Sequence, residues 1–215
     1  PKELLEFEGG EYRDIISVFI SIPQNLTGNI FKSKLENILE LTKVYGGYFN
    51  SLEYGDKGLL AFIIFGAPVS YENNIERSLR FVLSLRKVIK TNIGLTFGRV
   101  YCGIIGNRII SSYTAIGDNV NLAARFMTES KKSEIWVTRK IAEVMERFFQ
   151  FKYLGKKSIK GKKQKVDVFN LIREKNKPYF REFSGKFIGR SDVLKNLLKL
   201  TTPVFNSRFG GVVYI

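Results

Sequence analysis

Apolar and polar residues alternate along this chain with a period that switches between two and about 3.6 residues. A period of two indicates a half-buried strand, and a period near 3.6 indicates an amphipathic helix. Pro23 ends the first strand-like run, and Gly46-Gly47 ends the first helix-like run. The predicted elements are strand 15–22, helix 28–45, strands 48–54 and 59–65, helix 72–90, strands 92–98, 100–105 and 110–116, helix 118–129, strand 135–138, a helix to about residue 148, and strands near 149–155 and 166–172.

The order strand, helix, strand, strand, helix, strand predicts an α+β domain. Its sheet should be centred on antiparallel strands, with helices on one face, as in ferredoxin-like folds. Thr138 precedes the late helix and can cap its N-terminus. Residues 174–186 are polar and basic and are broken by Pro178 and Gly185, which indicates a linker.

Composition narrows the chemistry that the chain can perform. The 215 residues include one Cys and no His, which excludes a disulfide framework and a His-based triad and argues against a zinc site. Cys102 lies in an apolar run and is expected to be a buried small hydrophobe. The longest apolar stretch, residues 58–68, is too short to span a bilayer. With no signal-peptide pattern, we expect a cytoplasmic protein without a membrane span.

The net charge of +15 raises the possibility of a nucleic-acid or membrane partner. Much of the excess is local, because residues 152–165 contain seven lysines and no acid. One interpretation is a solvated hairpin, and the other is a lobe that faces phosphates. We expect no aromatic stacking platform among these lysines, which argues against single-strand binding.

One helix carries the most specific chemistry. Asn121 and Arg125 are four residues apart, so they share one face near the start of helix 118–129. An amide and a guanidinium near a helix N-terminus suit an anionic, oxygen-rich ligand. The alternative is an incidental polar pair on a surface helix.

The surrounding string YTAIGDNVNLAARF, residues 113–126, resembles the signature helix of the class III nucleotidyl cyclases. The segments Gly55-Asp56-Lys57-Gly58, Phe65-Gly66-Ala67-Pro68 and Ile93 to Gly106 resemble family motifs in the same order, and the similarity covers roughly residues 11 to 173. The resemblance implies that Asn121 and Arg125 stabilise the ribose and triphosphate in the transition state. It also implies that Thr114 reads the purine base.

The family's metal site is incomplete in this sequence. The resemblance implies two divalent ions, Mg²⁺ or Mn²⁺, held by two Asp residues. Ser21 stands where the first Asp is expected, and a neutral hydroxyl cannot replace a carboxylate for Mg²⁺. Asp56 is a candidate for the second, although it can equally be a residue that only shapes the turn. We therefore expect the metal to be held mainly by a partner domain.

The residues that remain match one half of a composite site. In tandem cyclases the second domain supplies a base-reading Lys, a base-reading residue before the signature and the Asn/Arg pair, and here these are Lys57, Thr114, Asn121 and Arg125. The chain is most similar to the second cyclase domain of soluble adenylyl cyclases and their bacterial cyclase–ATPase relatives. Lys57 can also be an exposed turn lysine. Thr114 can donate and accept, so it fits adenine without excluding guanine.

This resemblance implies ATP as substrate and a first-type cyclase domain, from the same polypeptide, as the partner in a pseudo-dimer. Cyclic AMP and pyrophosphate would be the products. A degenerate regulatory domain that binds nucleotide or an activator without turnover is the alternative. A basic nucleic-acid-binding module is a third reading, but the chain lacks the aromatic-rich strand motif of RNA-recognition domains, so we expect no specific nucleic acid.

Residues 187–215 form a separate segment after the linker. Phe187-Ile188-Gly189-Arg190 and the apolar run 211–215 resemble the start of an ATPase module of the AAA/STAND group. No G-x-x-x-x-G-K-[ST] motif follows, so no ATPase activity is assigned. The alternative is a C-terminal helix that packs back on the cyclase core. The predicted division is a cyclase domain at 1–173, a linker at 174–186 and a truncated ATPase start at 187–215.

Overall fold

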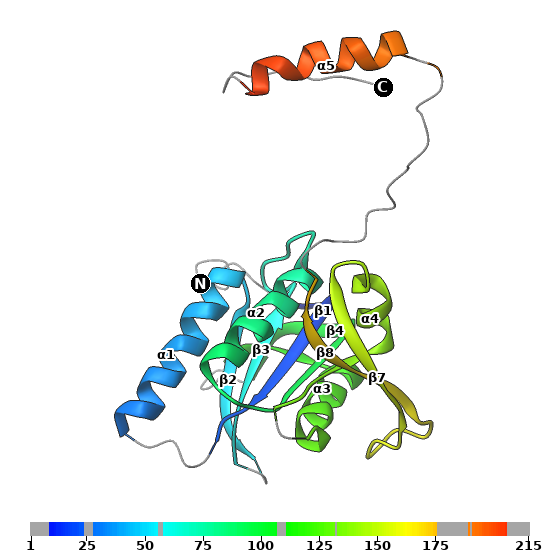
Figure 1. The fold of residues 1–215 in the computed structure, drawn as a ribbon. Coiled ribbons are helices and arrows are strands. Elements are labelled where there is room, and N and C mark those ends of the chain that lie inside the picture. Colours follow the sequence, from blue (N-terminus) through cyan, green and yellow to red (C-terminus); the bar gives the residue numbers. More distant parts are fainter. Residues whose placement is uncertain are drawn as a thin grey trace. The chain divides into compact units, whose positions relative to one another are not determined.

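The computed structural model describes residues 9–23, 28–55, 58–106, 111–131, 133–175, 189 and 191–205. The chain divides into two compact units, residues 1–179 and 180–215. The first unit (Figure 1) contains β1 (Gly10–Ser21), α1 (Gly28–Tyr45), β2 (Tyr48–Gly55), β3 (Gly58–Phe65), α2 (Asn74–Val88), β4 (Ile93–Gly106), β5 (Ser111–Ile116), α3 (Asp118–Glu129), β6 (Ile135–Thr138), α4 (Arg139–Met145), β7 (Phe149–Lys157) and β8 (Val166–Glu174).

The described strands of this unit form one sheet in the order β2-β3-β1-β4-β6-β8-β7, with β5 paired to β4. Each of these pairings is antiparallel except β4 with β6, which is parallel. The centre of the sheet is the long β1–β4 ladder, which runs from Gly10 opposite Gly103 to Ile20 opposite Ile93. The predicted α+β class with an antiparallel-centred sheet is confirmed.

The two faces of the sheet are covered by different helices. Alternate residues of β1 and β3, such as Val18 and Ile63, pack with buried residues of α1, α2 and α4. The residues between them, such as Phe19 and Phe62, belong to a second core that includes Val120, Ala123 and Met127 of α3. Helices therefore cover both faces of the sheet and not one as predicted: α1, α2 and α4 lie on one face, and the signature helix α3 lies on the other.

The region predicted as two strands, 92–98 and 100–105, is a single strand, β4. The prediction left a gap at Arg99, but β1 pairs with β4 on both sides of that residue, and Gly98 beside it does not break the strand. Gly98 is instead a point of close approach, because a Cβ there would overlap the amide of Asn119 at the start of α3. Gly94 serves the same purpose one turn further along α3, where a Cβ would overlap the carbonyl oxygen of Ala123. These two glycines let the signature helix lie directly on β4.

The helix after β6 also differs in detail from its prediction. It ends at Met145 rather than near residue 148, and the Phe148 amide bonds to the Met145 carbonyl at 3.0 Å. Thr138 occupies the N-cap position, but its hydroxyl makes no capping hydrogen bond. The Thr138 hydroxyl is buried without a hydrogen-bond partner, so the predicted cap is wrong. Its neighbours on β6 pair with β8, and this long-range ladder positions the start of the helix.

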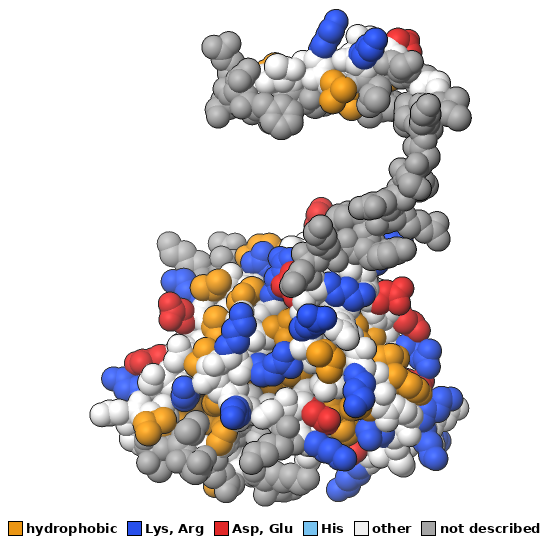
Figure 2. Space-filling view, in the orientation of Figure 1, with side chains coloured by type: hydrophobic (Ala, Val, Ile, Leu, Met, Phe, Trp, Pro, Cys, Tyr) orange, Lys and Arg blue, Asp and Glu red, His pale blue; other side chains and the backbone are white. Residues whose placement is uncertain are grey.

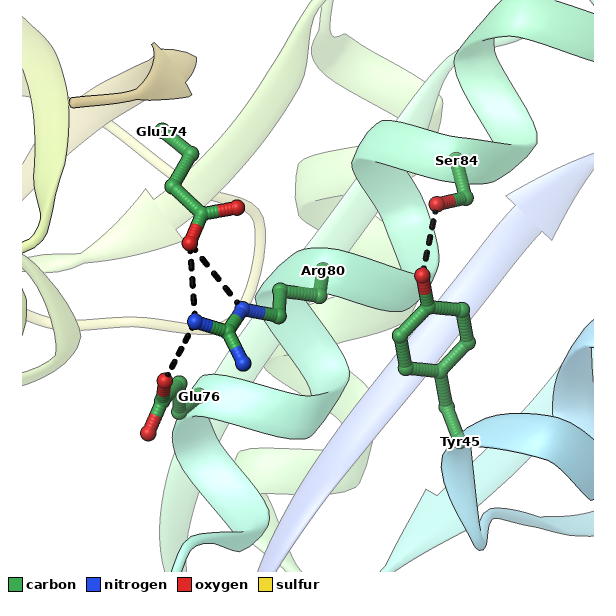
Figure 3. Close-up of polar contacts among 5 residues, drawn as sticks. All are labelled: Tyr45, Glu76, Arg80, Ser84 and Glu174. Carbon is green, nitrogen blue, oxygen red and sulfur yellow. Dashed lines mark hydrogen bonds and ion pairs between the residues drawn. The ribbon is translucent and has the colours of Figure 1, made fainter. Parts of the chain in front are cut away.

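Polar contacts fasten α2 to its neighbours on both sides (Figure 3). Arg80 lies 2.8 Å from Glu76 on the same helix and donates to Glu174 at the end of β8, also at 2.8 Å. These carboxylates, with the Glu174 hydrogen bond as the main cause, raise the pKa of the Arg80 guanidinium. On the other side, the hydroxyls of Tyr45 in α1 and Ser84 lie 2.8 Å apart. The three charged groups are partly exposed, so their contribution to stability is small, within about 1 kcal/mol.

The folded core extends slightly into the predicted linker. β8 ends at Glu174, and the next amide, of Lys175, bonds to the Phe148 carbonyl at 2.8 Å. The rest of the predicted linker lies outside the described residues. The second unit contributes helix α5 (Ser191–Phe205), which includes Pro203. The expected strand at 211–215 also lies outside the described residues. No helix of the described residues is long and apolar enough to cross a membrane.

Candidate active site

The signature helix is held on the sheet by a buried polar contact and by apolar packing. Thr96 of β4 is fully buried, and its hydroxyl donates to the Asn119 carbonyl at 2.6 Å. This bond satisfies a hydroxyl that would otherwise be costly to bury, and it ties the first turn of α3 to β4. On the same side, Ala123 and Met127 contact the sheet, so the opposite side of the helix is left for polar residues.

Asn121 and Arg125 lie on that polar side, as predicted. Asn121 is exposed and Arg125 is half-buried. One guanidinium nitrogen of Arg125, Nη1, donates a hydrogen bond to the backbone carbonyl of Lys160, which lies in the connection between β7 and β8. Arg125 of helix α3 is thus joined to a residue that lies 35 positions later in the chain.

This β7–β8 connection, residues 158–165, packs along α3 and is not simply a solvated hairpin. Ile159 is 2% exposed and belongs to a small core with Leu122 and Phe126 of α3. Lys162 forms an ion pair with Asp118 in the first turn of α3, with 3.0 Å between Nζ and Oδ2. The lysine-rich segment therefore rests against the helix that carries Asn121 and Arg125.

Gly161 makes this close docking possible. Its φ of +76° is rarely adopted by other residues, and an added Cβ would lie 2.5 Å from Nη1 and 3.1 Å from Cζ of Arg125. A side chain at this position would therefore push the guanidinium away from the Lys160 carbonyl. The glycine and the carbonyl together fix where the arginine points.

Thr114, the predicted base reader, is half-buried on β5 and is contacted from β2. Its hydroxyl donates to the side-chain oxygen Oδ1 of Asn50 at 3.1 Å. The amide nitrogen Nδ2 of Asn50 donates to the Tyr113 carbonyl at 2.7 Å. The sequence prediction did not include Asn50. β2 contains three polar residues, Asn50, Ser51 and Glu53, and their pattern neither singled out Asn50 nor revealed that β2 would meet β5.

The floor beneath Thr114 is apolar. Tyr113 is 3% exposed and packs edge-on against Tyr48 of β2, with ring centroids 5.7 Å apart. Cys102 of β4 is fully buried in the same cluster, as predicted. Burial raises the pKa of the Cys102 thiol to about 11 and that of the Tyr113 hydroxyl to about 12, so both groups stay neutral at physiological pH. This floor supplies shape rather than charge.

The described residues do not form a metal site. Ser21 ends β1, with its amide bonded to the Asn92 carbonyl at 3.0 Å and its carbonyl accepting from the Thr91 hydroxyl. These bonds fix the backbone of Ser21, and its side chain offers a neutral oxygen only. Asp56 and Lys57 lie outside the described residues, in the connection between β2 and β3. Among the residues that are described, no group of three or more His, Cys, Asp or Glu side chains could hold a metal ion. The family's metals therefore do not fit these residues, and we assign no step through a metal to this chain.

The arrangement is suited to binding a polyanion that carries a polar ring. Arg125 offers a positioned guanidinium that can meet negative charge as it develops. Thr114 and Asn121 stand on either side of the single turn at Gly117, which joins β5 to α3. The structure thus places Thr114 with Asn50, and Arg125 with the β7–β8 connection. The positions of Lys57 and Asp56 relative to them remain predictions from the sequence.

Comparison with known proteins identifies the family and the fold. The family model for the adenylate and guanylate cyclase catalytic domain matches residues 61–173. Adenylate cyclase type 10 of Rattus norvegicus is 29% identical over 131 residues, which cover 54% of this chain and 8% of that protein. The chain therefore spans only a small part of this relative.

Two solved structures share the fold. The adenylyl cyclase CyaB from P. aeruginosa superposes with a TM-score of 0.70 at 18% identity, over 79% of this chain and 98% of that one. The guanylate cyclase domain of RhGC from Catenaria anguillulae, solved in complex with GTP, gives 0.66 at 21% identity, over 77% of this chain and all of that one. Because the family model covers more than half of the chain, this chain belongs to the class III nucleotidyl cyclases, the family of adenylate and guanylate cyclase catalytic domains.

Proposed function

We propose that this chain is the second half of a composite adenylyl cyclase site that converts ATP to cyclic AMP and pyrophosphate. The observation that carries the proposal is an imbalance within one domain. Asn121 and Arg125 stand on an intact signature helix, whereas Ser21 provides no carboxylate at the end of β1. A first-type cyclase domain, which we expect in the same polypeptide, would complete the site in a pseudo-dimer.

In this arrangement the chain's own residues bind and orient the nucleotide. Thr114, with Lys57, contacts the adenine edge, and Asn121 holds the ribose. When the 3′-hydroxyl attacks the α-phosphorus and the bond to pyrophosphate breaks, negative charge grows on the phosphate oxygens. Arg125 offsets that charge, a contribution worth about 3–4 kcal/mol for a single positioned donor. The Mg²⁺ or Mn²⁺ on which the family depends would be held mainly by carboxylates of the partner domain.

A non-catalytic regulatory domain is the second candidate. Two observations favour it: Ser21 in place of a carboxylate, and the Arg125 guanidinium already bonded to the Lys160 carbonyl. In that case the same pocket would bind nucleotide or an activator without turnover. Kinetics with the partner domain present separate the two candidates.

The first test compares the chain alone with the reconstituted pair. The purified chain, given ATP with Mg²⁺ or Mn²⁺, should make almost no cyclic AMP, because a homodimer would lack the first carboxylate at both of its sites. Adding the first-type domain should restore turnover. Strong cyclic AMP formation by the chain alone would contradict the composite site, and a pair that binds ATP without turning it over would favour the regulatory candidate.

The second test assigns Arg125 within the active pair. Arg125→Ala should lower kcat by about 100-fold or more and change ATP affinity much less, because the guanidinium acts mainly on transition-state charge. Arg147→Ala, at an exposed arginine, is the matched control and should leave kcat unchanged. If Arg125→Ala keeps turnover within about a factor of two, the assigned role is wrong.

A further inference from the structure

Asn50 occupies an irregular position in β2 that aims it at the base-reading residue. The ladder between β2 and β3 pairs Phe49 with Ile63 and then Ser51 with Phe62, so Asn50 is an extra, unpaired residue in a β-bulge. Bulges re-aim side chains and are frequent beside active sites. Here the bulge sends the Asn50 amide across to β5, where it bonds to both Tyr113 and Thr114.

These two bonds determine which way the hydrogen of the Thr114 hydroxyl points. The Tyr113 backbone carbonyl can only accept, so the atom of Asn50 that faces it at 2.7 Å must be the amide nitrogen. The amide oxygen of Asn50 therefore faces Thr114 at 3.1 Å, and that oxygen can only accept. The Thr114 hydroxyl has one hydrogen, and it donates that hydrogen to the Asn50 amide oxygen.

A hydroxyl whose single hydrogen is already donated can only accept from a further partner. The 6-position of adenine carries an amino group, which donates, whereas guanine and hypoxanthine carry a 6-oxo group, which accepts. A Thr114 hydroxyl that can only accept matches the 6-amino group of adenine. Opposite a 6-oxo group it leaves two acceptors facing each other, which repel. Thr114 alone fits either base, so any discrimination that runs through Thr114 must come from the group that accepts its hydrogen.

We propose that Asn50 makes Thr114 selective for adenine, because it fixes the Thr114 hydroxyl as a hydrogen-bond acceptor. The inference rests on the proposed function in one respect, namely that Thr114 faces the 6-position of the base. Asn50 is a positioning residue, since it acts through Thr114 and not on the reacting atoms.

The test compares ATP with ITP, which replaces the 6-amino group by a 6-oxo group and lacks the 2-amino group of GTP. The chain paired with its first-type domain should prefer ATP in kcat/KM. Asn50→Leu keeps the side chain's size but removes the acceptor, which frees the Thr114 hydroxyl to donate. The ATP/ITP ratio should then fall by about tenfold, which is the effect of one hydrogen bond gained or lost.

Asn50→Asp separates the two hydrogen bonds of Asn50, because its carboxylate can still accept the Thr114 hydrogen but cannot donate to the Tyr113 carbonyl, so thermal stability should fall. It should keep the ATP/ITP ratio of the original pair, a rescue that a purely structural role of Asn50 does not predict. Asn50→Ala serves as a second variant without the acceptor if the leucine disturbs folding, which thermal unfolding reports. A ratio within about twofold of the original in both acceptor-free variants would overturn the inference.

Failure of the proposed function can be distinguished from failure of the inference about Asn50. A pair that makes no cyclic AMP would contradict the proposed function, yet competition of ATP and ITP against a fluorescent nucleotide still measures base preference at equilibrium. A preference for ATP that Asn50→Leu narrows and Asn50→Asp preserves would then support the inference on binding alone. Equal binding of ATP and ITP by the original pair would overturn it.

Discussion

At the scale of single residues, the described groups near Thr114 and Arg125 work through hydrogen bonds and not through shifted titrations. Arg125 is directed by the Lys160 carbonyl, and Thr114 is directed by Asn50. Two titratable groups lie beneath Thr114, the Cys102 thiol and the Tyr113 hydroxyl. Both are neutral, because burial disfavours their charged forms. We infer that the part of base selection that runs through Thr114 depends on the direction of its hydroxyl hydrogen.

The buried thiol leads to a prediction about reactivity and pH. Burial raises the Cys102 pKa from its ordinary value of 9.0 to about 11, so the folded chain should resist alkylation near pH 8 and react only after unfolding. A raised folded pKa gives stability that is complete below pH 9 and is lost as the pH rises toward 11. Cys102→Ala should therefore lose less of its thermal stability over that interval than the original chain.

The measurements are the rate of iodoacetamide labelling, with and without denaturant, and the unfolding midpoint from pH 8 to pH 11. The sequence has a single cysteine, so the labelled site is unambiguous. Rapid labelling of the native chain near pH 8 would show that the cluster of β4 and β5 opens more readily than its burial indicates.

At the scale of elements, the β7–β8 connection and the signature helix form one unit. Ile159 packs into the core beside α3, Lys162 pairs with Asp118, and the Lys160 carbonyl holds Arg125. The prediction of a solvated hairpin therefore describes only part of the segment, and the alternative of a phosphate-facing lobe stays a prediction. Its tip is exposed, whereas its backbone positions a residue of the site.

Gly161→Ala tests that coupling. The added methyl group would overlap the Arg125 guanidinium and also strain a backbone with φ of +76°. We expect kcat of the reconstituted pair to fall by about tenfold, because displacement of a positioned donor weakens transition-state stabilisation. Affinity for ATP should change less.

Gly155→Ala separates strain from overlap. Gly155 has a similar φ of +87°, but a Cβ there meets no heavy atom within 4 Å. The two variants should lose similar thermal stability, and only Gly161→Ala should lose turnover. Equal turnover in both would mean that the carbonyl and glycine do not position Arg125 for catalysis.

At the scale of the whole molecule, the positive charge is distributed and partly paired. Figure 2 shows Lys and Arg side chains over much of the visible face, with acidic and apolar side chains among them. A group of basic side chains gathers over the β7–β8 hairpin at the lower right. One aromatic residue, Tyr153, lies among the lysines of 152–165 and is half exposed. However, its hydroxyl donates to Asp167 at 2.6 Å and its ring packs against Phe169, so the residue is engaged within the domain.

We therefore expect only weak, non-specific binding of DNA or RNA, with a dissociation constant no tighter than about micromolar at physiological salt and a steep loss as salt rises. Replacing Lys160 and Lys162 by Gln should flatten that salt dependence, and it should also impair pairing of the cyclase domains or affinity for ATP. The measurements are oligonucleotide binding across a salt series and activity of the reconstituted pair. Tight, sequence-selective binding, with activity unchanged in the Gln variants, would instead favour the nucleic-acid interpretation.

The sequence by itself determined the elements whose pattern is local. The bounds of α1 and α3 match their predictions, because helical periodicity and the glycines at their ends act within a few residues. The motif around Asn121 and Arg125 also identified the family, since a signature of this length depends on residue order and not on packing.

Only the tertiary structure decided the features that depend on contacts between distant segments. The sequence pattern divided β4 into two strands near Gly98, but the ladder with β1 is continuous there, and the missing side chain of Gly98 accommodates Asn119 on another element. Thr138 has the sequence of a cap, yet the β6–β8 ladder holds it where its hydroxyl makes no capping bond. The partners of Thr114 and Arg125 lie 64 and 35 residues away from them. Local propensity cannot encode such pairings, because they exist only once the sheet has brought β2 to β5 and the β7–β8 connection to α3.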